Sequence, residues 1–536
     1  MKNHHEQPTE QQQGLSRRNF LTTAVVGLTG IAAVGLAGCN ARQSEEGNTA
    51  AGDTSQLPGT WDGEADVVVC GGGGSGLTAA YAALDAGASV LVLEKGDVVG
   101  GTTALAEGAV QAAGTAWQKE LTSYQDDNAE KHFLYWMTDA EGLVEEDLVR
   151  SMAENAADNL QWMADNFGIT FSKVFGCLPT PYLPDDLMAD RIHLITDATD
   201  ATKTGGTVWT TKAEAAVKDK GGEILTGTAV ASLIMDGANG VAGVTTSDGK
   251  NYKANKGVVL AMAGIEHNEE LARKYNPQHY WDLKTQQVVT AATDTGDGIE
   301  MGLAAGADVG RFGGCVDLIL ATWSGTNNTN PEMPAIFVNM RGNRFVREDT
   351  TYAFHMRSCF NEAMQEGGWD GCTWMVLDSK MTTMDAQSPW SDAIEGGTQQ
   401  REDDLASGTL LKADTIEALA TAMGVPSANL AFTVQKWNAD TTAGNDSLYG
   451  RVKQVVPLDT APYYAYRILH TNIGAIGGLR INDRAAVLNV SGKEIGHLYA
   501  AGTNSGGWLG PYYPGSGTCL QGALHWGRTA GASAAS

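Results

Sequence analysis

Closely spaced cysteine pairs are absent from this sequence. Its seven cysteines form neither a CxxC pair nor the CxxCH motif that attaches haem. The sequence therefore predicts no metal site, no iron–sulfur cluster and no disulfide framework, although cysteines far apart in the chain could still meet in the fold. Any redox chemistry of this chain would consequently depend on an organic cofactor.

Basic residues are also scarce. The 536 residues include 36 lysines and arginines against 63 aspartates and glutamates, which gives a formal net charge of -27. A surface this acidic repels nucleic-acid backbones and anionic membranes, so the composition excludes nucleic acid as an expected partner. The length is sufficient for two domains with cores of their own.

The apolar stretch near the N-terminus, residues 21–36, is shorter than a typical membrane span and rich in glycine and alanine. It follows residues 16–20 (SRRNF), a pattern typical of a twin-arginine export signal. Residues 36–39 (LAGC) resemble a lipobox, in which Cys39 would be lipidated. We therefore expect a signal over 1–39 and a flexible tether over 40–60. The mature protein would lie in the periplasm or on the outer face of the cell membrane.

A glycine-rich turn follows the first strand expected in the folded part of the chain. Residues 66–70 (DVVVC) form a continuous apolar run, typical of a buried parallel strand, and residues 71–76 (GGGGSG) fit the pattern GxGxxG. A helix over 77–86 and a second strand over 88–93 are expected next. Glu94 then stands where an acid holds ribose hydroxyls. This complete set of features predicts a dinucleotide site.

Each glycine of the turn has a physical role in such a site. Gly71 permits the tight turn, Gly73 lets a pyrophosphate approach the backbone, and Gly76 lets the helix and strand pack closely. The N-terminus of the helix presents unpaired N–H groups and a positive dipole end to the phosphates.

Residues 65–115 resemble the flavoprotein superfamily of fumarate reductases and 3-ketosteroid dehydrogenases. In that family a GG-[ST]-[ST] segment wraps the flavin, and residues 100–103 (GGTT) match it. The resemblance continues, in the family's order, through the segments 226–230, 257–264, 295–298 and 497–502. It implies FAD as the cofactor and an α/β fold, in which a Rossmann-like FAD-binding domain carries an inserted α+β capping domain.

The resemblance also implies which residues hold FAD. They belong to the glycine-rich turn, the acid after the second strand, the GG segment, the strand at 226–230 and the C-terminal segments. The expected FAD-binding residues are Gly71, Gly73, Gly74, Ser75, Gly76, Glu94, Lys95, Gly101, Thr102, Thr103, Val230, Gly502, Ser516, Thr518 and Leu520. Membrane-bound fumarate reductases carry a flavin-linking histidine in the GG segment. This chain has threonines there, so we expect non-covalent FAD.

The order of the matching segments implies a split FAD-binding domain, residues 61–308 and 473–536, with the capping domain inserted at 309–472. Residues 378–408 are polar with scattered proline and glycine, and we expect an irregular surface segment of the cap there. A last helix over 515–534 would direct its N-terminus at the flavin and stabilise the anionic reduced ring. The substrate would lie between the cap and the flavin.

Two branches of the family differ at residues that this sequence shows. Dicarboxylate reductases use an arginine as proton donor in a segment like RF-x-N-E-x-x-T-R, and the matching residues here are 344–352 (RFVREDTTY). Tyr352 stands at the position of that arginine, where ketosteroid dehydrogenases have a catalytic tyrosine. A third active-site tyrosine of that branch loosely matches Tyr182.

The glycine-rich turn before the last helix, residues 512–517 (YYPGSG), lacks the carboxylate-binding arginine of the dicarboxylate reductases. The pattern Y-P-G-x-G is that of the ketosteroid dehydrogenases. In that branch the tyrosine hydroxyl and the last glycine N–H hold a ketone oxygen, which implies Tyr513 and Gly517 here. The dicarboxylate reductases also have a histidine three residues before a GGL segment, which is residues 477–479 here. This chain has Gly474 at that position, and its nearest histidine, His470, lies further back. These changes disfavour a substrate like fumarate.

These residues suit the reduction of a C=C bond conjugated to a carbonyl, as in a steroid-type enone or an unsaturated lactone. A hydride from FAD N5 would reach the β-carbon, and Tyr513 and Gly517 would stabilise the charge on the carbonyl oxygen. Tyr352 would transfer the proton at the α-carbon. The same arrangement run backwards is a dehydrogenase.

Two alternatives remain open from the sequence. The substrate could be an unsaturated carboxylic acid like fumarate, urocanate or cinnamate, or the chain could be a non-catalytic flavin electron-transfer subunit. No second nucleotide-binding fold is evident after the split domain, and an exported protein is separated from cytoplasmic NADH. We therefore expect an external electron donor, such as a membrane cytochrome or a flavin carrier.

Overall fold

The computed structural model describes residues 57–176, 183–285, 287–319, 334–384 and 388–536, all within the compact unit Ser55–Ser536. The expected export signal, Cys39 and Tyr182 lie outside the described residues. Within the described ranges, no helix has both the length and the apolar character that crossing a bilayer requires.

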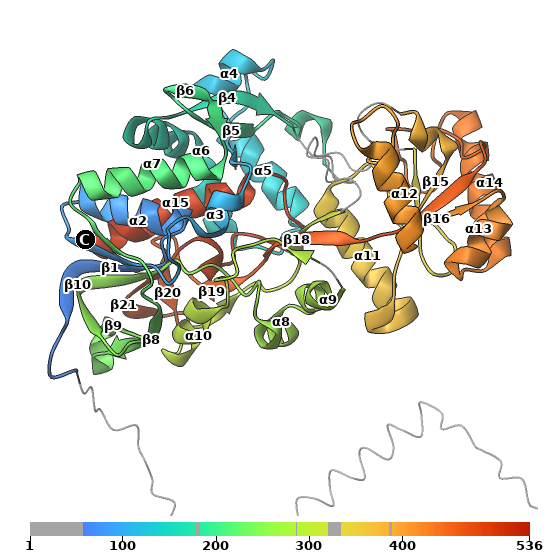
Figure 1. Ribbon diagram of the computed structural model, residues 1–536. Coiled ribbons are helices and arrows are strands. Elements are labelled where there is room, and N and C mark those ends of the chain that lie inside the picture. The colour runs from blue at the N-terminus through green and yellow to red at the C-terminus, as the bar shows by residue number, and fades with distance from the viewer. Residues whose placement is uncertain (1–56, 177–182, 286, 320–333, 385–387) are drawn as a thin grey trace, which may run out of the picture. The chain divides into compact units, whose positions relative to one another are not determined.

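A mostly parallel sheet of eight strands forms the centre of the expected FAD-binding domain (Figure 1). Strand β1 (Gly63–Cys70) lies between β10 (Asn251–Leu260) and β2 (Val90–Leu93) and runs parallel to both. Both faces of β1 are covered, so its last four residues are fully buried, as their apolar run predicts. The other strands are β7 (Glu223–Leu225), β8 (Val230–Met235), β9 (Val241–Thr246), β20 (Ala486–Leu488) and β21 (Glu494–Ala500).

Helices from both ends of the chain pack on this sheet. Helix α2 (Gly74–Asp85) lies against α15 (Thr518–Ala535), and α7 (Gly206–Asp219) lies on the other side of α2 (Figure 1). The contact between α2 and α15 is backbone to backbone, because a Cβ at Gly531 would stand 2.0 Å from the carbonyl oxygen of Ala79. The C-terminal helix therefore packs on the first helix of the folded part of the chain.

A second, four-stranded sheet lies beside α7 and the long helix α6 (Figure 1). Its strands are β3 (Ala109–Gln111), β5 (Ile192–Asp197), β4 (Ile169–Phe175) and β6 (Asp200–Thr204). The helices before and around it are α3 (Gly101–Leu105), α4 (Ala116–Leu121), α5 (Ala129–Asp139) and α6 (Glu146–Phe167).

Two three-stranded sheets connect these parts. One has the order β11 (Gln287–Val288), β18 (His470–Ala475), β13 (Cys315–Ile319), and the other β12 (Val309–Gly310), β19 (Gly478–Arg480), β22 (Ser505–Gly506). The helices next to them are α8 (Glu269–Tyr275), α9 (Pro277–Thr285) and α10 (Asp297–Ala304).

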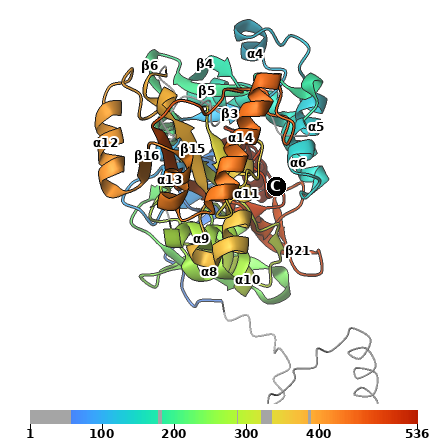
Figure 2. The same cartoon turned by 90° about the vertical axis from the view of Figure 1, so that its right-hand side faces the viewer.

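The expected capping domain has a sheet of its own with a core on each face. Its strands are β14 (Ile336–Val338), β15 (Trp374–Asp378), β17 (Tyr463–Arg467) and β16 (Leu410–Ala413). Successive residues of β14 enter opposite cores, Phe337 on one face and Val338 on the other, as the two-residue period of a strand requires. Its helices, partly seen around β15 and β16 in Figure 2, are α11 (Tyr352–Gly367), α12 (Gly397–Ser407), α13 (Ile416–Met423) and α14 (Ser427–Ala443).

Two local expectations are wrong. Residues 378–408 are not irregular throughout, because α12 forms within them and the Trp390 side chain is fully buried with its indole N–H donating to Asp404 at 2.7 Å. Residues 226–229 join β7 to β8 instead of forming a strand. The Gly227 and Thr228 amides there donate to the segment around Glu94, which fixes a loop. The domain boundaries at 61, 309 and 473 stay predictions.

Candidate functional site

A cavity of about 730 Å³ runs from the glycine-rich turn at the end of β1 to the start of α11 and α15. This volume is in the range of cofactor and ligand sites. It is lined by residues from most of the described segments that the sequence marks for FAD or for catalysis. The expected residues among them are Gly71, Gly73, Gly74, Ser75, Glu94, Lys95, Gly101, Thr102, Thr103, Val230, Tyr352, Gly502, Tyr513, Ser516, Gly517 and Leu520.

Two expected residues do not line the cavity. A Cβ at Gly76 would stand 1.9 Å from the carbonyl oxygen of Gly71, so this glycine allows α2 to pack on the turn. Thr518 is buried, and its hydroxyl donates to the carbonyl oxygen of Gly515 at 2.9 Å. Both residues shape the walls of the cavity from behind.

The turn after β1 leaves backbone open to the cavity. Gly71 has a φ of +102°, and a Cβ there would collide with the carbonyl oxygen of Ala261 at 2.2 Å. A Cβ at Gly73 would find no atom closer than 3.9 Å, so the backbone faces free space at that point. Helix α2 begins at Gly74 without a side-chain cap. Its first N–H groups and positive dipole end therefore suit a pyrophosphate.

Glu94 is held rigidly at the end of β2. Its two carboxylate oxygens accept N–H bonds from Gly72 and Gly96, each at 2.6 Å, and the residue lines the cavity. Each oxygen keeps a second lone pair for a ribose hydroxyl. Open glycine backbone and a fixed acid are what a dinucleotide requires, so the residues present fit FAD.

The GG segment is tied to the opposite wall. The Thr102 hydroxyl donates to Asp294 at 2.5 Å and accepts the Ala291 N–H at 2.7 Å. Burial and the nearby Glu266 raise the pKa of Asp294 to about 8. At neutral pH this carboxyl group is therefore largely protonated.

Tyr352 and Tyr513 come together in the lining of the cavity from different parts of the chain. Tyr352 is the first residue of α11, and Tyr513 precedes α15. Their ring centroids lie 6.1 Å apart, and both residues are at most 4% exposed. The Tyr352 hydroxyl lies 3.4 Å from Ser516 Oγ, and the Tyr513 hydroxyl accepts the Cys519 N–H at 3.1 Å.

Burial raises the pKa of both phenols above the ordinary value for tyrosine. The charged form of a phenol is disfavoured in a dry environment. Both hydroxyls therefore keep their protons at neutral pH and can act as hydrogen-bond or proton donors.

Gly517 closes the turn before α15 in a left-handed conformation with a φ of +94°. A Cβ there would stand 2.7 Å from the Gln111 nitrogen, so only glycine fits. The residue is the N-cap of α15, where the positive end of the helix dipole meets the cavity.

The cavity is also lined by ionisable residues that the sequence does not single out. They are Glu107, Lys173, Glu266, Asp294 and Cys519. Burial raises the pKa of Glu107. Among the described lining residues, the cations are Lys95, which pairs with Asp297 at 2.7 Å, and Lys173, which lies over the Phe175 ring at 4.6 Å. No arginine or histidine occurs in this described lining.

Residues 66–520 match the model of the FAD-binding domain family. The chain belongs to this family. The resemblance to the flavoproteins that include fumarate reductases and 3-ketosteroid dehydrogenases is thereby confirmed. FAD is the cofactor of the chain.

Relatives of this flavoprotein include reductases and dehydrogenases. The digoxin reductase of Eggerthella lenta is 29% identical over 97% of each chain. A 3-ketosteroid-Δ4-(5α)-dehydrogenase of Rhodococcus jostii, solved with 4-androstene-3,17-dione, is 27% identical with a TM-score of 0.73, over 90% of this chain and 99% of that one. A flavocytochrome c3 fumarate reductase is 26% identical with a TM-score of 0.64, over 89% and 78%. The chain is an FAD-dependent oxidoreductase.

We expect Glu94→Gln to weaken FAD retention about 10- to 100-fold. A glutamine turns one accepting oxygen into an N–H₂ group facing a backbone N–H, which costs about 1–3 kcal/mol at a buried position. The ratio of flavin to protein absorbance after extensive dialysis measures the effect. Glu223→Gln, which changes an exposed glutamate on β7, should retain FAD fully. Equal flavin content in both variants would contradict the assigned role.

Proposed function

We propose that this flavoprotein reduces a C=C bond conjugated to a neutral carbonyl group, with a steroid-type enone or an unsaturated lactone as substrate. The observation that supports it most is the pairing of Tyr352 and Tyr513. Two buried, protonated phenols, one at the start of α11 and one before α15, meet in the lining of the cavity that the expected FAD-binding residues also line.

FAD, held by the residues described above, would supply the hydride of the reaction. The chain itself must orient the substrate, stabilise the charge that develops on the carbonyl oxygen, and deliver a proton to the α-carbon. Tyr513 has an oriented hydroxyl, because it accepts the Cys519 N–H and also contacts the Cys519 side chain. Its O–H would turn to a bound carbonyl oxygen as donor. With the N–H of Gly517 it forms the donor pair for the carbonyl oxygen. Tyr352, held beside Ser516, delivers the proton.

The electrostatics of the two tyrosines favour the reductive direction. A dehydrogenase needs a base to remove the α-proton, and a tyrosinate is costly where burial raises the pKa of the phenol. A reductase needs an acid, which a buried phenol provides at neutral pH. Both phenols therefore start a reductive cycle in the protonated form that it requires.

The described lining favours a neutral carbonyl over a carboxylate. Recognition of a dicarboxylate uses paired, charge-assisted hydrogen bonds of the kind that arginine provides. The described lining holds only lysines as cations, and Lys95 is already paired with Asp297.

Lys173 supports a second candidate, an unsaturated monocarboxylic acid. Its ammonium group forms no ion pair with a carboxylate of the described residues and lies at the cavity wall. An aryl acrylate could place its carboxylate there while its double bond reaches the tyrosines.

We expect Lys173→Met to separate these two candidates. Loss of one exposed ion pair costs about 1 kcal/mol, so KM for a cinnamate-type acid should rise about fivefold, with little change for an enone. Lys119→Met, on the exposed face of α4, is the matched control. Steady-state kinetics with both substrates give the answer, and an equal response of acid and enone would remove Lys173 from substrate binding.

The binding mode of FAD and the location of the protein complete the proposal. FAD is non-covalent, because the GG segment carries Thr102 and Thr103 and no histidine. Acid precipitation should release all the flavin into the supernatant. The chain is exported by the twin-arginine route, lipid-anchored through Cys39, and reduced by an external carrier in place of NADH. Fast turnover with NADH alone would contradict the last point.

The function is tested by reoxidation of the reduced flavin without oxygen. The full-length protein is reduced with dithionite, and absorbance near 450 nm is followed as fumarate, a cinnamate-type acid, a 3-keto-4-ene steroid or an unsaturated lactone is added. Recovery with the enone or the lactone supports the proposal. Recovery of the absorbance with fumarate alone would contradict the proposal and indicate a dicarboxylate reductase. Failure with every unsaturated compound would favour the alternative that the chain is a non-catalytic electron-transfer subunit.

A further inference from the structure

The wall of the cavity formed by β13 and β18 has a polar cluster behind it. Val316 and Leu318 of β13 line the cavity. Cys315 and Asp317, the alternate residues of the same strand, enter a buried cluster with Asp282 of α9. The proposed mechanism uses none of these polar groups.

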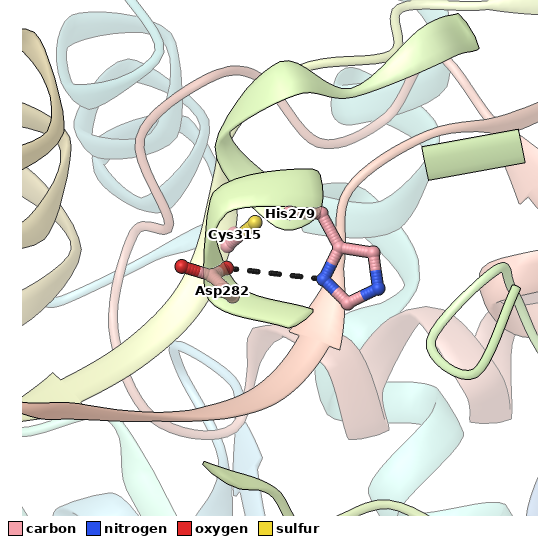
Figure 3. A group of neighbouring side chains, drawn as sticks. All are labelled: His279, Asp282 and Cys315. Atoms are coloured by element: carbon pink, nitrogen blue, oxygen red, sulfur yellow. Dashed lines mark ion pairs between the residues drawn. The ribbon is translucent and has the colours of Figure 1, made fainter. Parts of the chain in front are cut away.

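Within this cluster His279, Asp282 and Cys315 converge on one point (Figure 3). One ligand atom from each, a ring nitrogen, a carboxylate oxygen and the sulfur, lies within 4.8 Å of the other two. All three side chains are buried, at 0–1% exposure. Two of them come from one turn of α9 and the third from the facing strand, so the geometry is set by the fold.

His279 is oriented as a metal ligand. Its Nε2 lies 3.0 Å from the carbonyl oxygen of Glu266, which can only accept, so Nε2 carries the hydrogen. Nδ1 then carries a lone pair in the neutral ring. This Nδ1 makes no hydrogen bond and lies 3.8 Å from Asp282 Oδ2, an ion-pair distance when the ring is protonated (Figure 3). Against the effect of burial, Asp282 and Glu266 raise the pKa of His279, so a metal ion would bind here by displacing a proton. Metal-binding histidines are commonly fixed in this way, with the distal N–H donating to a backbone carbonyl.

Asp282 is also held from behind. Its Oδ1 accepts from His470 Nε2 at 2.5 Å and its Oδ2 accepts from Asn472 Nδ2 at 2.9 Å. Asp317, which accepts from Asn472 and Gln278, adds a second buried carboxyl group to the cluster. Buried carboxylates are costly unless a cation or hydrogen bonds offset the loss of water. A divalent cation bound to Asp282 would offset the cost of burying that carboxylate, while burial raises the pKa of Asp317 and favours its neutral form.

We propose that His279 Nδ1, Asp282 Oδ2 and Cys315 Sγ bind a zinc ion. Nitrogen, oxygen and sulfur together are a ligand set that zinc accepts. A zinc ion about 2.0–2.3 Å from each ligand atom separates those atoms by roughly 3–4 Å, and the 3.8 Å between Nδ1 and Oδ2 agrees with this. Cys315 binds as the thiolate, and its proton leaves to solvent. The ion ties α9 to the strand that forms the cavity wall.

The alternative is a hydrogen-bonded cluster without metal, in which protonated histidines balance the carboxylates. The two cases differ in what the intact protein contains. The full-length chain, purified without a histidine tag, is analysed for zinc by plasma mass spectrometry. It is then stripped with a chelator and titrated with ZnCl₂ or CoCl₂. We expect about one zinc per chain, and thiolate-to-cobalt charge-transfer absorption in the stripped protein loaded with cobalt.

Cys315→Ser and His279→Gln should each lower zinc affinity at least tenfold, and Cys315→Ser should abolish the thiolate-to-cobalt band. Cys359→Ser replaces another buried cysteine outside the cluster and should leave both readouts unchanged. Bound FAD and circular dichroism show whether each variant is folded. A wild-type chain that contains no zinc and takes up neither metal overturns the proposal, as does undiminished zinc binding in a folded Cys315→Ser.

Discussion

Tyr352→Phe is expected to lower the rate of enone reduction by about 10²–10⁴-fold, the usual contribution of a general acid. The phenol is the proton donor that the mechanism assigns to the α-carbon, and phenylalanine keeps the ring and removes only that proton. The hydroxyl lies 3.4 Å from Ser516 Oγ, a long hydrogen bond, so its loss should cost the fold no more than about 1 kcal/mol. Single-turnover reoxidation of the reduced flavin measures the chemical step directly.

The control for this variant is Tyr81→Phe. The Tyr81 hydroxyl donates a hydrogen bond to Asn166 at 2.9 Å and also interacts with Lys220, and the ring is 6% exposed in a part of α2 that does not line the cavity. Its rate should match that of the wild type. A Tyr352→Phe rate within threefold of the control would assign the proton to another group, and Glu107 and Cys519 would then be the candidates.

Local patterns in the sequence explain why most of the expected cofactor residues line one cavity. The strand, the glycine-rich turn and Glu94 are neighbours along the chain, so their spacing carries most of the geometry. Gly71 and Gly73 show why, since one needs a positive φ and the other needs free space beside its backbone. Both requirements concern the residue itself and appear directly as glycine.

The pairing of Tyr352 with Tyr513 could be predicted only through the resemblance to a family. The residues are 161 positions apart, and no periodicity links the start of α11 to the turn before α15. Contacts of this kind depend on how the capping domain meets the FAD-binding domain. The resemblance carries that arrangement because the family shares it.

The remaining residues of the site carry no local signal. Glu266 and Asp294 follow strands in segments without a motif for an acid, and only the fold brings them to one cavity. The cluster behind β13 is a stronger case. Cys315 and His279 are 36 positions apart, outside the short spacings that mark zinc sites in sequences. The expectation of no metal site rested on spacing, whereas the zinc proposal rests on the distances between side chains.

Tyr513→Phe is expected to lower kcat for an enone by about 10²–10³-fold, the cost of removing one donor from an oxyanion site. The hydroxyl accepts the Cys519 N–H, so the variant also leaves that amide without this acceptor. The amide belongs to the first turn of α15, where N–H groups have no partner within the helix. Cys519→Ala keeps the amide and removes only the sulfur. It should retain most of the activity, which separates the hydroxyl from its neighbour.

The double variant Tyr352→Phe/Tyr513→Phe tests whether the two phenols act on one substrate. Their rings lie 6.1 Å apart, close enough to contact the two ends of a conjugated carbonyl system. Groups that serve the same transition state are not additive, because protonation of the α-carbon gains little once the charge on oxygen is no longer stabilised. The double variant should therefore be less impaired than the product of the single effects. Strictly multiplicative losses would place the two hydroxyls in separate steps, and Tyr513 would then stabilise the turn before α15 in place of the substrate oxygen.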